Sequence, residues 1–218
     1  MSSELLRLLE VMDQLRSPGG CPWDAEQTHQ SLIKYLLEES YEFIDSVESE
    51  DRQAMKEELG DLLLQVYFHS RIAEEHPTEP FSIEDVAAGI ADKLVRRHPH
   101  VFGDVKAESS EEVLQNWELL KAAEKSRTSA TDGVALSQPA LPLITKLIYR
   151  AEKNGINLDL PVDLPTAHMN NDVPAEIAIG DALVAAVVAA IKQGIEPEDL
   201  LRARAREISD EIKRIESL

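Results

Sequence analysis

The chain has 218 residues, an apolar fraction of 43% and a formal net charge of −19, which is enough for one domain or two small ones with a real core. The acidic balance argues against nucleic acid as a direct partner, because a phosphate backbone requires a basic face, although a bound divalent ion can still reverse the local sign for an acidic substrate. The single cysteine, Cys21, excludes an internal disulfide framework and suits a cytoplasmic protein.

The first expected elements are helices, since Gly and Pro are sparse and strong helix formers are common. Residues 3–16 carry leucines at helical spacing, and the Ser-Pro-Gly-Gly stretch over 17–20 ends that helix. We expect residues 21–24 to form an ordered loop. Thr28 is the expected N-cap of a helix over about residues 29–48.

Three glutamates lie on the helix predicted over residues 29–48. Its apolar stripe consists of Ile33, Leu36, Leu37, Phe43, Ile44 and Val47. At about 100° per residue, Glu39 falls at the edge of that stripe, Glu42 lies about 60° further round and Glu38 faces further out still. We therefore expect Glu39 and Glu42 to face a site at the rim of the core. Glu38 is either a supporting ligand or a solvated surface charge.

Two further carboxylates lie on the next helix, which is predicted over about residues 51–76. Its apolar stripe consists of Met55, Leu59, Leu62, Leu63 and Val66. Glu58 and Asp61 are i,i+3 neighbours along one margin of that stripe. Because the connection from Glu48 to Asp51 is short, the two helices should pack antiparallel and bring their carboxylate margins together.

Such a cluster of carboxylates predicts a bound cation, because like charges at this spacing destabilise a helix. Hard oxygen ligands around phosphates favour Mg²⁺. The alternative is an acidic face that is merely solvated. A Mg²⁺ site would support phosphoryl or nucleotidyl hydrolysis, with a carboxylate that is not fully used as a ligand orienting or deprotonating the attacking water.

A capping box variant at Ser82 predicts the start of a helix that runs to about His98. Lys93 and Arg97 are i,i+4 on this helix and share a face. Together with Arg96 they would hold the outer phosphates of a substrate, since guanidinium groups bind phosphate in bidentate fashion. The alternative is a cationic C-terminus that complements the helix dipole.

A further helix is expected over about residues 111–126, with Ser110 as its cap. It carries Trp117, whose ring would either stack on a base near the phosphate-binding groups or pack in the core. Residues 127–138 are rich in Ser, Thr, Asp and Gly, and this composition predicts a flexible linker.

Residues 139–218 begin a second helical unit that resembles the first. Gly60-Asp61 aligns with Gly180-Asp181, and residues 83–86 align with residues 197–200. This alignment places Ala178 at Glu58, Glu207 at Lys93, Asp210 at Arg96 and Glu211 at Arg97. We interpret the unit as a degenerate copy that has lost its metal ligands and reversed its phosphate-binding charge. Chance similarity between amphipathic helices is the alternative.

Two stretches of this second unit have specific interpretations. Residues 161–174 are too rich in proline to form a helix that would match the one with paired glutamates. The longest nearly apolar run, Ile177 to Ile191, carries Asp181 and is too short to span a membrane. We therefore expect a buried core helix and no membrane partner.

Taken together, the motifs of residues 1–126 resemble the MazG family of all-α nucleoside triphosphate pyrophosphohydrolases. The residues that carry the resemblance are Gly20-Cys21-Pro22-Trp23-Asp24 with Gln27-Thr28-His29, Glu38-Glu39 with Glu42, Glu58-Leu59-Gly60-Asp61 followed by Leu62-Leu63-Leu64-Gln65, the run from Lys93 to Phe102, and Trp117-Glu118 with Lys121.

The resemblance implies an antiparallel helical bundle with a catalytic domain over residues 1–126, a linker over 127–138 and a degenerate domain over 139–218. It implies cleavage of NTPs and dNTPs to NMP and pyrophosphate, with broad or non-canonical specificity, and a homodimer or higher oligomer. It implies phosphate contacts from Lys93 and Arg97 and a base contact near Trp117. The metal would be Mg²⁺, with Mn²⁺ as a possible substitute, held by Glu39, Glu42, Glu58 and Asp61 beside Glu38.

Two alternative functions stay open. One is a hydrolase that is narrow for a single nucleotide such as dUTP or dCTP. The other is a non-catalytic helical protein that senses a nucleotide or a stress signal, which would bind nucleotide without turning it over.

Overall fold

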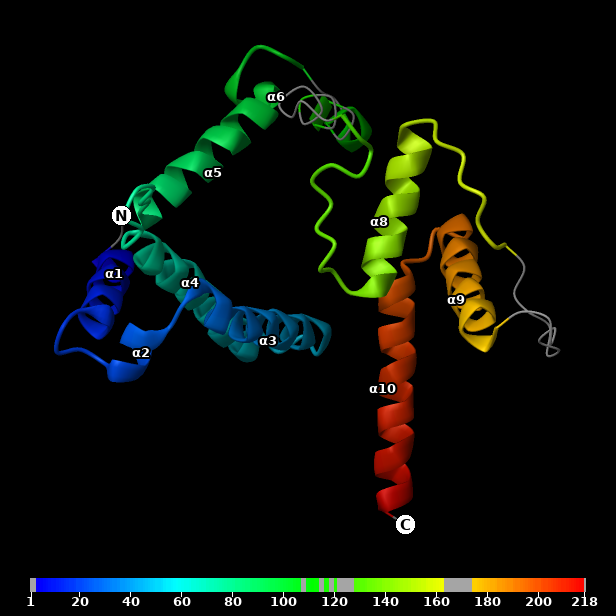
Figure 1. Cartoon of the computed structure of the whole chain (residues 1–218), viewed down its shortest axis with the longest axis horizontal. Coiled ribbons are helices and arrows are strands. Elements are labelled where there is room, and N and C mark those ends of the chain that lie inside the picture. Colours follow the sequence, from blue (N-terminus) through cyan, green and yellow to red (C-terminus); the bar gives the residue numbers. More distant parts are fainter. Residues whose placement is uncertain are drawn as a thin grey trace. The chain divides into compact units, whose positions relative to one another are not determined.

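The computed structural model describes residues 3–106, 109–113, 116–117, 120, 128–162 and 174–217. The chain divides into two compact units, Met1–Lys121 and Ala122–Leu218, and all regular elements in the described ranges are α-helices (Figure 1). This confirms the all-α prediction. The domain boundaries expected from the sequence, and the interpretation of the second unit as a degenerate copy, stay predictions.

The first unit is organised around a helical hairpin. Its helices are α1 (Ser3–Arg16), α2 (Pro22–Glu26), α3 (His29–Glu48), α4 (Arg52–Ala73), α5 (Ile83–Arg97) and α6 (Pro99–Phe102). Helices α3 and α4 form the hairpin and pack side by side (Figure 1). Thr28 begins α3 in a capping box with Ser31, and the Asp51 carboxylate accepts hydrogen bonds from the backbone N–H groups of Gln53 and Ala54 at the start of α4.

The expectation of a loop over residues 21–24 is wrong, because Pro22 begins the five-residue helix α2. The reason is that proline fits the first helical position, where no backbone N–H is needed. Trp23 on this helix lies edge-on to Tyr35 and Phe68, with ring centres 5.9 and 6.4 Å apart. The short helix therefore closes one end of the core, whose buried members are Met12, Leu32, Tyr67, Phe68 and Ile83.

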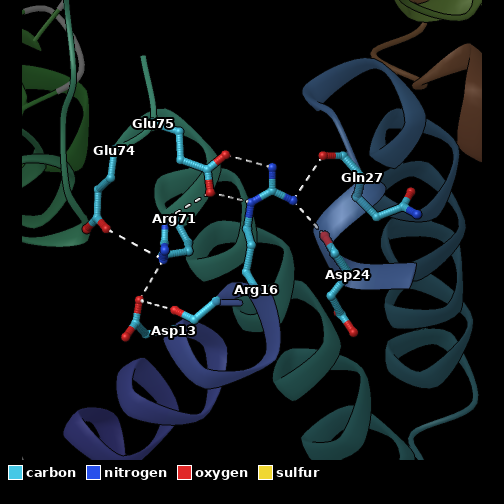
Figure 2. A network of polar contacts seen from close by, with 8 residues as sticks. Asp13, Arg16, Asp24, Gln27, Arg71, Glu74 and Glu75 are labelled. Atoms are coloured by element: carbon cyan, nitrogen blue, oxygen red, sulfur yellow. Dashed lines mark hydrogen bonds and ion pairs between the residues drawn. The ribbon is translucent and has the colours of Figure 1, made fainter. Parts of the chain in front are cut away.

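Arg16 ties the end of α1 to α2 and to the segment that follows α4 (Figure 2). Its guanidinium donates to the Glu75 carboxylate at 2.8 and 2.9 Å and to the carbonyl oxygens of Asp24 and Gln27 at 2.6 and 3.0 Å. Arg71 donates to the same Glu75 at 3.0 Å. Because Gln27 immediately precedes the cap of α3, this network fixes where α3 begins.

The apolar stripe predicted for α3 is only partly buried. Of its members Ile33, Leu36, Leu37 and Val47 are 37–52% exposed, whereas the fully buried leucine of this helix is Leu32. The physical reason is that the apolar residues of α3 extend around more of the helix than α4 alone can cover. Within the described part of the first unit, a partly exposed apolar face therefore runs along α3.

The second unit contains α8 (Ala140–Lys153), α9 (Ala175–Lys192) and α10 (Pro197–Glu216), packed around Ile148, Val187 and Val188. The apolar run predicted as a core helix lies in α9, and among the described helices none combines the length and apolarity needed to cross a bilayer. Asp132 accepts from the backbone N–H groups of Thr128 and Ser129, which makes a turn within the expected linker. Much of the helix expected over 111–126, and of the proline-rich stretch 161–174, lies outside the described residues.

Candidate active site

Three carboxylates converge on the hairpin. Glu39 comes from α3, and Glu58 and Asp61 come from successive turns of α4; one oxygen of each lies within 4.8 Å of the others. The i,i+3 spacing puts Glu58 and Asp61 on one side of α4, and the pairing of the two helices places that side next to Glu39. All three side chains are half-buried at the margin of the apolar stripe.

The crowding of negative charge changes how these groups titrate. Burial raises the pKa of Glu39, and the charges of Asp61 and Glu42 raise it further. Burial is also the largest cause that raises the pKa of Glu58, followed by Glu42 and Asp61. One oxygen of Glu58, Oε2, is buried and has no hydrogen-bond partner among the described residues. The cluster thus concentrates negative charge at the margin of the core.

Glu42 and Glu38 lie at the edge of this cluster. Glu42 is exposed and, with Glu58, lines a cavity of about 370 Å³ at the end of the hairpin. Glu38 is exposed, and its charge is the smallest of the causes that raise the pKa of Glu39. Asp45 also lines the cavity, and sequence reasoning missed it, although it follows Glu42 at the same three-residue spacing that separates Glu42 from Glu39.

The chemistry of this donor set fits a hard divalent cation. All donors are carboxylate oxygens, which is the ligand type that Mg²⁺ and Mn²⁺ prefer over nitrogen or sulfur. A cation held by Glu39, Glu58 and Asp61 would also give the buried Oε2 atom of Glu58 the partner it lacks among the described residues.

The cationic residues form a second group at the C-terminal end of α5. Arg97 is 8% exposed, and its guanidinium carbon lies 5.4 Å from the centre of the Trp117 ring. Lys93 is half-buried and Arg96 is exposed. The opposite end of α5 packs in the core through Ile83, about 21 Å away along the helix axis. Within one chain, the structure brings Arg97 and Trp117 together, while the carboxylates gather on α3 and α4.

Comparison with known proteins places this chain in a family. A model of the MazG nucleotide pyrophosphohydrolase domain matches residues 27–102. A nucleoside triphosphate pyrophosphohydrolase/pyrophosphatase MazG of Thermotoga maritima is 37% identical over 224 residues, which cover 97% of this chain and 85% of that protein.

The chain belongs to the MazG family.

The MazG match over residues 27–102 encloses the carboxylates and the cations of α5 but ends before Trp117. A nucleoside triphosphate pyrophosphohydrolase of Mycobacterium tuberculosis is 45% identical over 83% of this chain, which spans only 55% of that relative. The solved structure of a MazG-related protein from Thermotoga maritima is 28% identical with a TM-score of 0.45, and the match covers 53% of this chain and 97% of that one.

A histidine pair on the same hairpin was not predicted from the sequence. The Nδ1 atoms of His29, at the start of α3, and His69, near the end of α4, lie 2.8 Å apart, and the two rings are parallel with centres 5.1 Å apart. Burial, and then the neighbouring His29, lower the pKa of His69. The pair was hidden because its members are 40 residues apart and match no metal-ligand spacing.

Proposed function

We propose that the protein hydrolyses nucleoside triphosphates to NMP and pyrophosphate in a Mg²⁺-dependent reaction. Its substrates would be NTPs and dNTPs, including non-canonical ones, and its role would be to remove such nucleotides from the cellular pool. The observation that carries this proposal is the convergence of Glu39, Glu58 and Asp61 within 4.8 Å, inside the stretch that matches the MazG domain. The single cysteine and the acidic charge support a role in the cytoplasm without nucleic acid as a partner.

In this proposal Glu39, Glu42, Glu58 and Asp61 hold the metal. A bound Mg²⁺, or Mn²⁺ in its place, supplies positive charge that offsets the charge on the phosphate oxygens. Glu38, which is exposed and lies outside that ligand set, would accept a proton from the attacking water. The new bond joins the water oxygen to the α-phosphorus, and the bond from that phosphorus to the bridging oxygen breaks, so that pyrophosphate leaves.

The outer phosphates are assigned to Lys93, Arg96 and Arg97. Arg97 supports this role because its guanidinium carbon lies 5.4 Å from the centre of the Trp117 ring, and a guanidinium oriented by an aromatic ring loses less side-chain entropy when it binds phosphate. In this arrangement Trp117 is a positioning residue that acts through Arg97.

We further propose that the protein works as a homodimer or higher oligomer. Ile33, Leu37 and Val47 expose 43–52% of their surface along α3, and apolar patches of this kind are usual at interfaces between copies of a chain. A second copy packed on this face would cover it. Such a copy could also bring its α5 cations to carboxylates that, within one chain, lie on other helices.

The deciding experiment measures pyrophosphate release from a panel of NTPs and dNTPs, with Mg²⁺, by the wild-type protein and the Glu42→Gln variant. Glu10→Gln, an exposed change on α1, is the matched control. Loss of turnover in Glu42→Gln alone supports the proposed site. If the Glu42→Gln variant still turns over nucleotides, the active site lies elsewhere, for instance in residues 139–218.

The same panel separates the alternatives. Turnover of dUTP or dCTP alone would show that the enzyme is specific for one nucleotide and would contradict broad specificity. Mg²⁺-dependent binding of nucleotides without any turnover would favour a sensor. Deletion of residues 139–218 tests the proposal that the second unit is a degenerate copy that completes or dimerises the bundle: unchanged activity and unchanged oligomeric state after the deletion would contradict it.

A further inference from the structure

Most of helix α10 projects from the second unit. Its first residue, Pro197, is buried, whereas every residue from Ala203 to Ser217 is exposed. Figure 1 shows the helix continuing past the ends of α8 and α9, the helices that it contacts within the unit. A helical segment of about 15 residues is marginal in water without packing. This part of α10 would therefore gain stability from a partner.

The exposed part of α10 carries one continuous apolar line, which we call the α10 seam. It consists of Leu201, Ala205, Ile208, Ile212 and Ile215, and its four large members expose 51–59% of their surface. The members are spaced alternately by four and three positions, which is the heptad spacing of residues that face a partner helix in a coiled coil. The other side of the helix carries the charged residues Arg206, Glu207, Asp210, Lys213 and Arg214. The pattern indicates that the seam packs against another helix.

The charge of α10 favours a second copy of this chain as the partner. The chain has a net charge of −19, so two copies repel each other over much of their surfaces. Helix α10 differs, because its five cationic and six anionic residues leave a net charge of only −1. The seam therefore lies where two copies can approach with little repulsion. A strongly basic or strongly acidic partner would find no complementary field on this helix.

The residues beside the seam make it complementary to itself in one direction. Arg204 and Glu211 each precede a seam residue and occupy the g positions of the heptad. In an antiparallel pair the g positions of the two helices face each other, so Arg204 of each copy lies opposite Glu211 of the other. In a parallel pair, Glu211 would instead face Glu216 of the second copy, and these like charges repel. The flanking charges therefore favour the antiparallel pair.

Arg204 and Glu211 can make this contact at little cost. Arg204 pairs with Glu207 and Glu211 pairs with Arg214 on the same helix, and the side chains in these two ion pairs are 53–63% exposed. Exposed pairs of this kind contribute little to stability. Exchanging them for, or sharing them with, contacts to a second copy therefore leaves the helix nearly as stable as before.

We propose that two copies of the chain associate through the α10 seam as an antiparallel helix pair. Leu201 would lie opposite Ile212 of the second copy, and Ala205 opposite Ile208. The inference goes beyond the proposed function and does not depend on it. The seam is also a different surface from the exposed apolar face of α3, so a chain that used both contacts would form an oligomer larger than a dimer. Because the seam is only about 21 Å long, the association should depend on protein concentration.

Disulfide formation between chains tests both the contact and its direction. Ala205→Cys and Ile208→Cys chains, each in a Cys21→Ser background, are mixed under mild oxidation. One chain is isotope-labelled, so that mass spectrometry distinguishes mixed from self-paired disulfides. We expect mainly mixed disulfides, because positions 205 and 208 lie opposite each other only in the antiparallel pair. Ala203→Cys mixed with Asp210→Cys is the matched control, since both positions face away from the seam, and it should give only background.

Sedimentation equilibrium of the full chain supplies an independent test. Ile212→Asp should lower the average mass about twofold relative to Ala203→Asp, which places the same charge on the opposite side of the helix. Arg204→Glu should raise the dissociation constant by about tenfold, because two attractive pairs become repulsive. The double variant Arg204→Glu/Glu211→Arg should recover most of the loss. An effect on helix stability alone would not produce this recovery, because the double variant also loses both pairs within the helix.

The remaining outcomes would overturn the proposal. Self-paired disulfides in place of mixed ones would contradict the antiparallel direction. Disulfides no more frequent than in the control, together with an Ile212→Asp mass equal to that of Ala203→Asp, would show that the seam is covered by another part of the chain or by a different protein. Neither readout involves turnover, so failure of this proposal and failure of pyrophosphohydrolysis are distinguishable.

Discussion

Arg16 and Glu75, 59 residues apart in the chain, form a two-point ion pair with N–O distances of 2.8 and 2.9 Å. The Arg16 side chain is only 7% exposed, whereas that of Glu75 is 44% exposed. The pair lowers the pKa of the Glu75 carboxyl, mainly through the hydrogen bonds from Arg16. Arg16 also donates to two backbone carbonyls, so its loss would leave several acceptors unpaired.

We therefore predict that Arg16→Met destabilises the protein by about 3 kcal/mol, since removing the buried guanidinium leaves the carbonyl oxygens of Asp24 and Gln27 without this donor. The measurement is the free energy of unfolding by urea. Arg7→Met is the matched control: its side chain is 74% exposed, and surface ion pairs contribute at most about 1 kcal/mol. Equal losses in the two variants would contradict the assigned role of Arg16.

Glu58→Gln is predicted to stabilise the metal-free protein once the pH exceeds the raised pKa of Glu58, and to remove most of the stabilisation by Mg²⁺. The pKa values of Glu39 and Glu58 are raised above 4.5, so the native state binds these protons more tightly than the unfolded state. Their contribution is present at low pH and is lost as pH rises through the raised pKa values. The variant should therefore lose less stability than wild type as pH rises.

Thermal unfolding from pH 4 to pH 8, with and without Mg²⁺, measures this effect, and Glu10→Gln serves as the control. With Mg²⁺ the trend should reverse, because the metal binds the deprotonated carboxylates and its affinity rises with pH. If addition of Mg²⁺ at pH 8 left the unfolding temperature of the wild-type protein unchanged, the result would contradict the metal site.

Gly20→Ala is predicted to destabilise the first unit by about 2–3 kcal/mol, as overpacking against rigid atoms does. A Cβ atom on Gly20 would lie 2.2 Å from the carbonyl oxygen of Gln14 and 2.4 Å from that of Leu15. Both contacts are with backbone atoms of α1, which cannot move aside without breaking the helix end.

Gly89→Ala provides the contrast for Gly20→Ala. Gly89 lies inside α5, and a Cβ there meets nothing within 4 Å, so alanine should stabilise the chain by about 0.5–1 kcal/mol. Urea unfolding of the two variants should give opposite signs. Destabilisation by both would indicate that the turn after α1 is not the sensitive feature.

The proposed oligomer is tested by Leu37→Asp, which puts a charge on the exposed apolar face of α3. We expect a lower molecular mass in sedimentation equilibrium and a concentration-dependent loss of turnover. Mixing Glu58→Gln with Lys93→Ala chains should restore part of the activity if carboxylates and cations come from different copies. An unchanged mass would contradict an interface at this face, and no recovery on mixing would favour a site within one chain.

Much of the hairpin could be predicted because its signals are local. The caps at Thr28 and Ser82 are confirmed by side-chain hydrogen bonds to the first turn of each helix, and the bounds of α3 agree with the 3.6-residue period. The end of α4 at Ala73, short of the expected residue 76, has no such signal.

What could not be predicted depends on contacts between distant residues. The His29–His69 pair and the partnerless Oε1 atom of Gln65 arise from the register of α3 against α4, which periodicity along one helix does not contain. The exposure of Ile33 and Leu37 was missed for a related reason, since a helical wheel shows which side chains are apolar but not how many neighbours cover them.

The α3–α4 hairpin also determines which changes in chain length the protein can accept. The carboxylates and the histidine pair lie between His29 and Ala73, and their alignment depends on how each of the two helices is rotated about its own axis. One residue inserted between Leu36 and Glu39 would rotate everything beyond it by about 100°. Residues added at the exposed connection over 49–51 would leave the rotation of both helices unchanged. We therefore expect natural insertions and deletions in this connection and not within the helices.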